Sequence, residues 1–145
     1  MEIIIYTDGS SKGNPGDAYS GALIILNKTK TLIGQYIKQA TNNVAELSAV
    51  GIVLKYLVNN YSKDCPNFDI KIYSDSQYVV NILKGNWIAK KNRDTIKKVK
   101  KYFQYFHSID FFYTDMYDED SYILDVDSFL EKIPDNGKLF IEYMQ

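Results

Sequence analysis

The stretch that decides the fold is Glu2-Ile3-Ile4-Ile5-Tyr6-Thr7-Asp8, a short run rich in β-branched residues. Such a run is typical of a buried β-strand, which we expect to end at its acid, Asp8. A loop of turn-forming residues follows over 9–16. Two further apolar runs, 20–26 and 31–37, are separated by a short polar turn, so they predict an antiparallel meander with the first strand.

The periodicity of the sequence changes in the next segment. Apolar residues recur every three or four positions over 44–58, which predicts a helix with one apolar face. Asn43 and Glu46 have the spacing of a capping box. We therefore expect Asn43 to be the N-cap of this helix.

A second pair with this spacing, Ser74 and Gln77, follows a strand-like run at 68–73 and predicts a short helix that ends at Leu83. The remaining segments are, in order, a basic amphipathic helix, a strand at 109–116, a helix at 124–133 and an apolar run of uncertain type at 138–143. This order predicts a mixed α/β fold in one domain, 1–145, with a five-stranded mixed sheet and helices on both faces.

Length and composition limit the class of protein. The 145 residues suit one domain, and 17 basic against 18 acidic residues argue against a basic nucleic-acid coat or an acidic disordered tail. A lone cysteine, Cys65, excludes an intramolecular disulfide and a cysteine-rich zinc site. Because no long apolar run and no signal-peptide pattern occurs, we expect no membrane partner and a location in the cytoplasm, nucleoid or nucleus rather than secretion.

The charges are unevenly distributed along the chain. Eight of the seventeen cations lie in 84–101, and eight of the eighteen acids lie in 110–131. One interpretation is a pair of solvated surfaces that neutralise each other, and the other is a phosphate-binding element beside a metal-binding or disordered loop. Charge alone leaves both interpretations open.

Three acids stand at the boundaries of predicted elements. Asp8 ends the first strand, Glu46 lies in the first turn of a helix, and Asp75 follows the fourth strand. Each has an ordinary explanation as a turn, capping or helix-dipole residue. In an α/β sheet, however, ligands gather beyond strand ends, and three acids there repel one another unless a cation neutralises them. Such oxygen ligands suit Mg²⁺ or Mn²⁺, and two ions can catalyse phosphodiester cleavage.

The residues around these acids resemble the motifs of the type 1 ribonuclease H family. The motifs are Tyr6-Thr7-Asp8-Gly9-Ser10-Ser11-Lys12-Gly13-Asn14-Pro15-Gly16, Thr41-Asn42-Asn43-Val44-Ala45-Glu46-Leu47 and Tyr73-Ser74-Asp75-Ser76-Gln77-Tyr78-Val79-Val80. They occur in the family's order with similar spacing, and the resemblance is strong over 1–100 and weak over 107–145. It implies a ribonuclease H fold and hydrolysis of the RNA strand of RNA–DNA hybrids, with 3′-hydroxyl and 5′-phosphate products.

The resemblance also implies a role for individual residues. The metal-binding catalytic acids would be Asp8, Glu46 and Asp75, with two Mg²⁺ ions that Mn²⁺ can replace. The substrate-binding residues would be Asn14, Asn42, Asn43 and Gln77 in the minor groove of the hybrid, Thr41 and Asn92 at a phosphate of the DNA strand, and Trp87, Lys90 and Lys91 beside them. Trp87 could equally lie in the core. The expected partner is an RNA–DNA hybrid, and the expected state is a monomer.

The resemblance weakens where the family has its fourth acid. The best counterpart is Asp127, with Asp125 as its competitor, and the asparagine of the family motif falls on Ile123. The loop before it lacks the family's histidine, and we expect His107 to be structural. An acid at 118–120 is an alternative to that histidine. The degenerate end leaves a catalytically inactive hybrid- or duplex-binding module as the alternative function, whereas the Thr-Asn-Asn motif argues against a DNA nuclease of the same fold.

Overall fold

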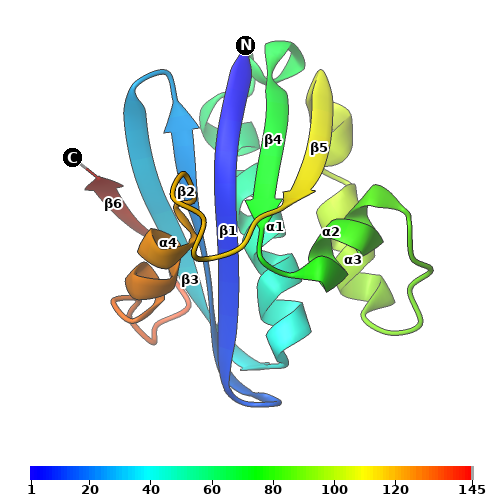
Figure 1. Ribbon diagram of the computed structural model, residues 1–145, viewed down its shortest axis with the longest axis vertical. Helices are drawn as coiled ribbons and strands as arrows, with labels where there is room; N and C mark the ends of the chain where they lie inside the picture. The colour runs from blue at the N-terminus through cyan, green and yellow to red at the C-terminus, as the bar shows by residue number, and fades with distance from the viewer. Residues whose placement is uncertain (145) are drawn as a thin grey trace.

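The computed structural model describes residues 1–144. Its strands are β1 (Glu2–Gly13), β2 (Gly16–Leu26), β3 (Thr29–Ala40), β4 (Asp69–Ser74), β5 (Ser108–Tyr113) and β6 (Phe140–Met144). Its α-helices are α1 (Asn42–Asn60), α2 (Gln77–Lys84), α3 (Arg93–Lys100) and α4 (Ile123–Leu130), and 3₁₀ turns cover Cys65–Asn67 and Phe103–Tyr105. Within this part of the chain the strands form one sheet in the order β5-β4-β1-β2-β3-β6 (Figure 1).

The sheet is mixed, as the sequence predicts. β1 is parallel to β4, and β4 to β5, whereas the β1–β2, β2–β3 and β3–β6 pairs are antiparallel. The expected count of five strands is wrong for residues 1–144, because the run of uncertain type at 138–143 overlaps β6, an edge strand on β3. Its Phe140 ring stacks on Phe129 of α4 with centroids 5.6 Å apart, which holds the strand to the sheet.

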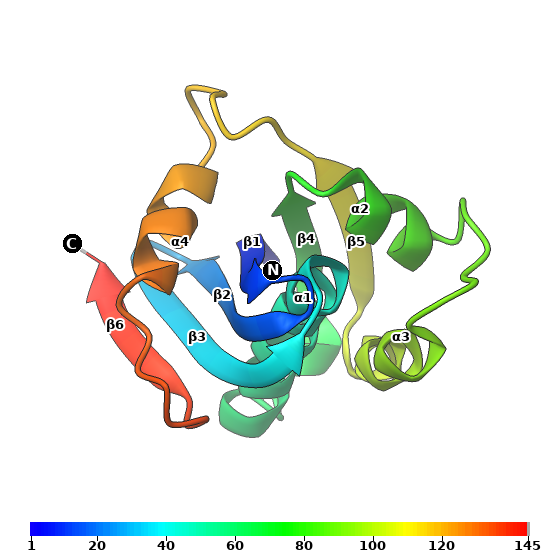
Figure 2. The same cartoon turned by 90° about the horizontal axis from the view of Figure 1, so that it is seen from below.

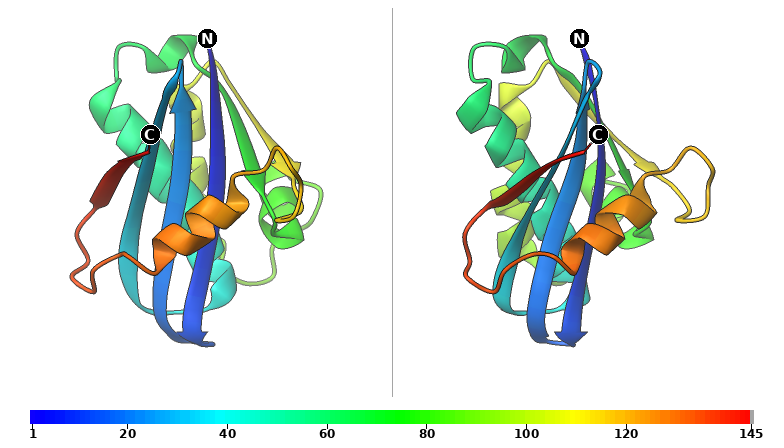
Figure 3. Two further views of the ribbon diagram at one scale, coloured as in Figure 1. Left: turned by 60° about the vertical axis from the view of Figure 1, so that its left-hand side comes forward. Right: turned by 90° about the vertical axis from the view of Figure 1, so that its left-hand side faces the viewer.

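Helices cover both faces of the sheet, which confirms the predicted layers. Viewed from below and from the side, α1, α2 and α3 lie on one face and α4 crosses the other (Figures 2 and 3). Successive side chains of β1 point to opposite faces of the sheet. Ile3 and Ile5 therefore join the hydrophobic cluster under α1, while Tyr6 joins the cluster under α4. No helix within residues 1–144 combines the length and the apolar character that a membrane span requires.

The expected turn-rich loop at 9–16 is mostly strand. Residues of β1 up to Gly13 pair with β2, so the connection is a tight hairpin turn at Asn14 and Pro15. The predicted strand at 109–116 is shorter, ending at Tyr113, and the predicted helix at 124–133 is displaced to Ile123–Leu130.

The helix caps differ from those that the spacing suggests. Thr41, not Asn43, caps α1, since its Oγ1 accepts a hydrogen bond of 3.2 Å from Val44 N. Ser76, not Ser74, caps α2 in the same way, with Val79 N as donor. The capping residue is the one immediately before the first helical residue. Asn43 lies inside α1, and Ser74 lies three residues before the start of α2, so neither is the cap.

The basic segment is an amphipathic helix, as predicted. Ile96 and Val99 of α3 are buried, and its lysines are exposed. The helix ends at Lys100, so the aromatic residues that continue its spacing lie in and around a 3₁₀ turn.

One glycine determines how closely α1 approaches β1. A Cβ on Gly9 would lie 2.5 Å from the backbone carbon of Ala45 and 2.6 Å from the backbone nitrogen of Glu46. The Ser20 hydroxyl of β2 donates a 2.6 Å hydrogen bond to the Ala45 carbonyl, which fixes the same turn of α1 from the neighbouring strand. The start of α1 therefore lies in backbone contact with β1 at the residue that directly follows Asp8.

Gly9→Ala should destabilise the protein by about 3 kcal/mol, because the added methyl group meets backbone rather than a flexible side chain. Urea unfolding followed by circular dichroism measures the change. Gly51→Ala is the matched control, since its Cβ meets only the end of the Val99 side chain at 3.3 Å and alanine favours a helix interior. Equal stability of the two variants would contradict the role assigned to Gly9.

Candidate active site

The structure brings together the acids that the sequence singles out. Asp8 lies on β1 and Asp75 directly after β4. Glu46 is the fifth residue of α1, so it lies in the second turn and not in the first turn that the sequence suggests, because α1 begins at Asn42. One carboxylate oxygen from each lies within 4.8 Å of the others. Parallel pairing of β1 with β4 places Asp8 and Asp75 at neighbouring strand ends, and the contact at Gly9 brings Glu46 to them.

Asp8 is almost completely enclosed, with 5% of its surface exposed. Burial, followed by the negative charge of Asp75, raises the pKa of Asp8 to about 7. The Gly9 amide donates a 2.9 Å hydrogen bond to Asp8 Oδ1 and opposes this shift. Without a cation, the site therefore holds a proton on this carboxyl at a pH where an ordinary aspartate is ionised.

Glu46 supplies the observation that tests whether a cation fits. Its Oε2 is buried and has no hydrogen-bond partner within the described residues. Burial and the charges of Asp8 and Asp75 raise its pKa well above the ordinary value, and burial also raises the pKa of Asp75. An unpartnered buried carboxylate oxygen beside two further carboxylates is the donor set of a hard divalent cation, so the residues present fit such an ion.

A fourth acid approaches from α4. The Asp127 side chain contributes to the raised pKa of Asp8, and its charge contributes to that of Asp75. Asp125 lies about 200° around the helix from Asp127, at roughly 100° per residue, and thus on another face. Asp115, which sequence reasoning did not single out, also raises the pKa of Asp75 by its charge.

The predicted amide residues connect the β1–β2 hairpin to α1. Asn14 Oδ1 accepts a 3.0 Å hydrogen bond from the Asn42 backbone, and Asn42 Oδ1 accepts hydrogen bonds from the backbone and hydroxyl of Ser11. Gln77 is exposed at the first turn of α2. The structure therefore positions Asn14 and Asn42 with their oxygens occupied.

Other predicted substrate residues share one depression beside this site. Its volume is about 330 Å³, and it is lined by Asn43, Tyr78, Ile82, Trp87, Ile88, Lys90, Lys91 and Asn92. Trp87 is 49% exposed, so its placement in the core is excluded. Asn92 has a left-handed backbone conformation and donates a 3.1 Å hydrogen bond to the hydroxyl of Tyr78. The sequence pattern did not indicate that Tyr78 lines this depression. Thr41 caps α1 next to Asn43.

Comparison with known proteins identifies the family. The model of the family described as RNase H matches residues 1–114. The chain belongs to the RNase H family. It is 40% identical over 89 residues to a ribonuclease H of Prosthecochloris aestuarii, covering 61% of this chain and 56% of that protein, and 36% identical over 100 residues to one of Acetivibrio thermocellus, covering 69% and 63%. These alignments span less than two thirds of the relatives' own length.

Solved structures of the RNase H family confirm the expected fold. LC11-RNase H1, isolated from compost by a metagenomic approach and crystallised in complex with an RNA/DNA hybrid, superposes with a TM-score of 0.78 at 26% identity, covering 90% of this chain and 95% of that chain. RNase H1 of Halobacterium salinarum gives a TM-score of 0.70 at 26% identity, covering 80% and 87%. The family generally uses a divalent metal, which agrees with the carboxylate cluster.

Hydrogen bonds within the acidic loop between β5 and α4, and one from β1, hold the conformation of this loop. Asp118 Oδ2 accepts hydrogen bonds from the Thr114 hydroxyl and the Asp115 backbone, and the Tyr6 hydroxyl donates to the Asp120 carbonyl. His107 instead bonds Asp69 at 2.7 Å at the opposite end of β5, which agrees with the expected structural role.

Asp8→Asn should stabilise the cation-free RNase H fold. The carboxyl has a pKa of about 7 in the folded state against its ordinary 3.8, so the folded chain binds a proton that the unfolded chain lacks between these values, and stability falls as pH rises from 4 to 7. The amide removes this loss. At pH 8 in EDTA we expect a gain of up to about 4 kcal/mol, since a pKa difference of about 3 corresponds to about 4 kcal/mol, and little gain near pH 4.

Urea unfolding at both pH values measures this difference. Asp125→Asn is the matched control on α4 and should show no such pH dependence. A gain for Asp8→Asn that is equal at pH 4 and pH 8 would contradict the electrostatic explanation.

Proposed function

We propose that this protein is an endonuclease that hydrolyses the RNA strand of RNA–DNA hybrids and leaves 3′-hydroxyl and 5′-phosphate ends. The observation that carries the proposal is the cluster of Asp8, Glu46 and Asp75 oxygens within 4.8 Å, with the Glu46 Oε2 unpartnered. Membership of the RNase H family and relatives that bear the name ribonuclease H support it.

Asp8, Glu46, Asp75 and Asp127 are the proposed metal ligands, for two Mg²⁺ ions that Mn²⁺ can replace. When bound, such ions activate the attacking water and stabilise the leaving oxygen of the scissile phosphodiester. The Gly9 amide and the packing of α1 hold the Asp8 and Glu46 carboxylates in place before any substrate arrives. The protein's own contribution is therefore a preorganised, mutually repelling set of oxygens.

The amide side chains are proposed to distinguish RNA from DNA. Asn14 and Asn42 use their oxygens inside the protein, which leaves their NH₂ groups to donate to 2′-hydroxyl or base acceptors of the minor groove. Asn43 and Gln77, both exposed, complete this proposed surface.

The depression that contains Trp87 is the proposed binding site for the DNA strand. Lys90, Lys91 and Asn92 line it, and Thr41 lies beside it, so cations and amide donors face a phosphate there. A crystallised RNase H1 neighbour is in complex with an RNA/DNA hybrid, which supports this partner. We propose that the protein acts as a monomer wherever hybrids form, in the cytoplasm, nucleoid or nucleus.

An inactive binding module accounts less well for the carboxylates. Burying Glu46 and Asp8 beside Asp75 destabilises the cation-free fold, as their raised pKa values indicate. Binding to a duplex backbone has no use for such a cluster, because carboxylates repel phosphates.

Cleavage of end-labelled duplexes tests the proposed function. With Mg²⁺ or Mn²⁺ we expect the RNA strand of an RNA–DNA hybrid to be cut internally, and double-stranded RNA and double-stranded DNA to remain intact. Asp8→Asn should reduce the rate at least about 100-fold, the scale of losing a catalytic group. Intact hybrid RNA after incubation with the folded wild-type protein and either metal would overturn the proposal.

The fourth ligand is tested by comparing Asp127→Ala with Asp125→Ala. We expect at least about a tenfold loss of hybrid cleavage for Asp127→Ala and near wild-type activity for Asp125→Ala, because the Asp127 side chain helps to raise the pKa of Asp8. Both residues lie on α4, so unfolding curves of the two variants reveal any loss through the helix itself. The reverse order of activities would assign the ligand to Asp125.

A further inference from the structure

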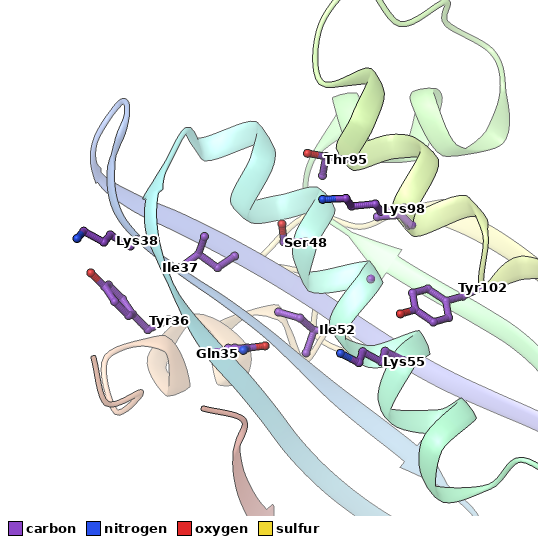
Figure 4. A pocket seen from close by; sticks show the side chains of 12 residues that line it. Gln35, Tyr36, Ile37, Lys38, Ser48, Ile52, Lys55, Thr95, Lys98 and Tyr102 are labelled. Atoms are coloured by element: carbon purple, nitrogen blue, oxygen red, sulfur yellow. The ribbon is translucent and has the colours of Figure 1, made fainter. Parts of the chain in front are cut away.

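A groove on the helical face of the sheet lies outside the site described above. It has a volume of about 520 Å³ and runs along α1, between α3 and the second half of β3 (Figure 4). Its polar lining comes from all these elements and includes Lys38, Ser48, Lys55, Thr95, Lys98 and Tyr102. Ile52 and Gly51 of α1 contribute the apolar floor.

The groove is cationic. Lys38, Lys55 and Lys98 come from β3, α1 and α3, and all are exposed. The ion pairs found within residues 1–144 use other residues, so these ammonium groups are not neutralised by a carboxylate of the same chain. No acid belongs to the lining residues, all of which are described. An anionic ligand therefore fits the groove.

The groove and the proposed nucleic-acid surface adjoin the same two helices, α1 and α3. Lys98 also lines a neighbouring depression beside α3, together with Lys97, Lys101 and one acid, Asp94. The first residues of α1 and α3 follow Thr41 and Asn92, the residues proposed to face a phosphate of the DNA strand. Both helices rise from this end of the molecule (Figure 1), and the groove lies along α1, between α3 and β3 (Figure 4).

We propose that this groove binds an unpaired continuation of the DNA strand where that strand extends beyond the hybrid. The proposal rests on the proposed function, which supplies the strand. A single strand can set its phosphates on the lysines while its bases lie against Tyr102 and Ile52, the combination of cations and aromatic surface that suits single-stranded nucleic acid. An acidic peptide would meet the same lysines, but the groove lies along helices that begin beside Thr41 and Asn92, the proposed phosphate-binding residues, and this position favours nucleic acid.

Binding of hybrids with and without an overhang tests the proposal. A blunt hybrid is compared in EDTA, by fluorescence anisotropy, with hybrids that carry about twelve unpaired nucleotides on either end of the DNA strand or on the RNA strand. We expect a DNA overhang at one end to lower Kd about 3–10-fold. Because each single-strand phosphate contact adds about 0.7 to the slope of log K against log salt, three lysines should steepen it by about 2.

Two double variants of equal charge distinguish binding in the groove from a general effect of the protein's net charge. Lys38→Gln/Lys55→Gln should lose most of the overhang's increment, while the Kd and cleavage rate of the blunt hybrid stay unchanged. Lys28→Gln/Lys63→Gln changes the same charge at exposed residues away from the groove and should keep the increment.

Three results would overturn the groove as a DNA-strand site: no overhang tightens binding, both double variants lose the increment equally, or a short acidic peptide displaces the overhang from the wild-type protein at a lower concentration than single-stranded DNA does. The proposed function fails separately, by the absence of hybrid cleavage, and an overhang increment that persists in that case would still support the groove.

Discussion

Mutual repulsion among buried carboxylates is the constraint on which the rest of this structure depends. Asp8, Glu46 and Asp75 come from a strand, a helix and the end of a second strand, so the fold must hold three independent elements against their own charges. It does so through backbone contact. Gly9 has no side chain to separate α1 from β1, and the Ser20 hydroxyl bonds the same helical turn. The hydrophobic clusters on both faces of the sheet stabilise the fold against the repulsion between these carboxylates.

The sequence predicts the clustering of three acids better than it predicts the elements around them. Asp8, Glu46 and Asp75 are identifiable because each stands at a boundary where periodicity changes, and strand ends meet at one edge of a sheet. The N-cap of α1 is harder to predict from the sequence, since Thr41, Asn42 and Asn43 all have side chains that can cap a helix. Thr41 is the cap because its backbone is extended and the helix begins directly after it.

Tertiary contacts decide the features that local patterns left open. β6 is a strand because β3 offers a free edge and Phe129 a ring to stack on, neither of which is visible in the short run around Phe140. Similarly, β1 extends through a glycine- and serine-rich segment because β2 pairs with it up to Gly13. Trp87 is exposed because its loop lies over the surface between α2 and α3 rather than against the sheet.

The near-zero net charge is the sum of a basic surface and an acidic cluster that lie apart, and this separation links the proposed binding of a cation to the proposed binding of nucleic acid. Cations gather on α3, its preceding loop and the adjoining groove, whereas acids surround Asp8 from β4, α1, α4 and the loop that contains Asp115. Under the proposed function, a phosphate on the basic surface would face carboxylates that repel it when no cation is bound. A cation at the carboxylates removes this repulsion, and the phosphate in turn supplies oxygen ligands to the cation. Each ligand must therefore increase the affinity of the other by the same factor, since coupling free energies are reciprocal. The segregation of charge, rather than its sum, is what makes a protein with a net charge of −1 suited to a polyanion.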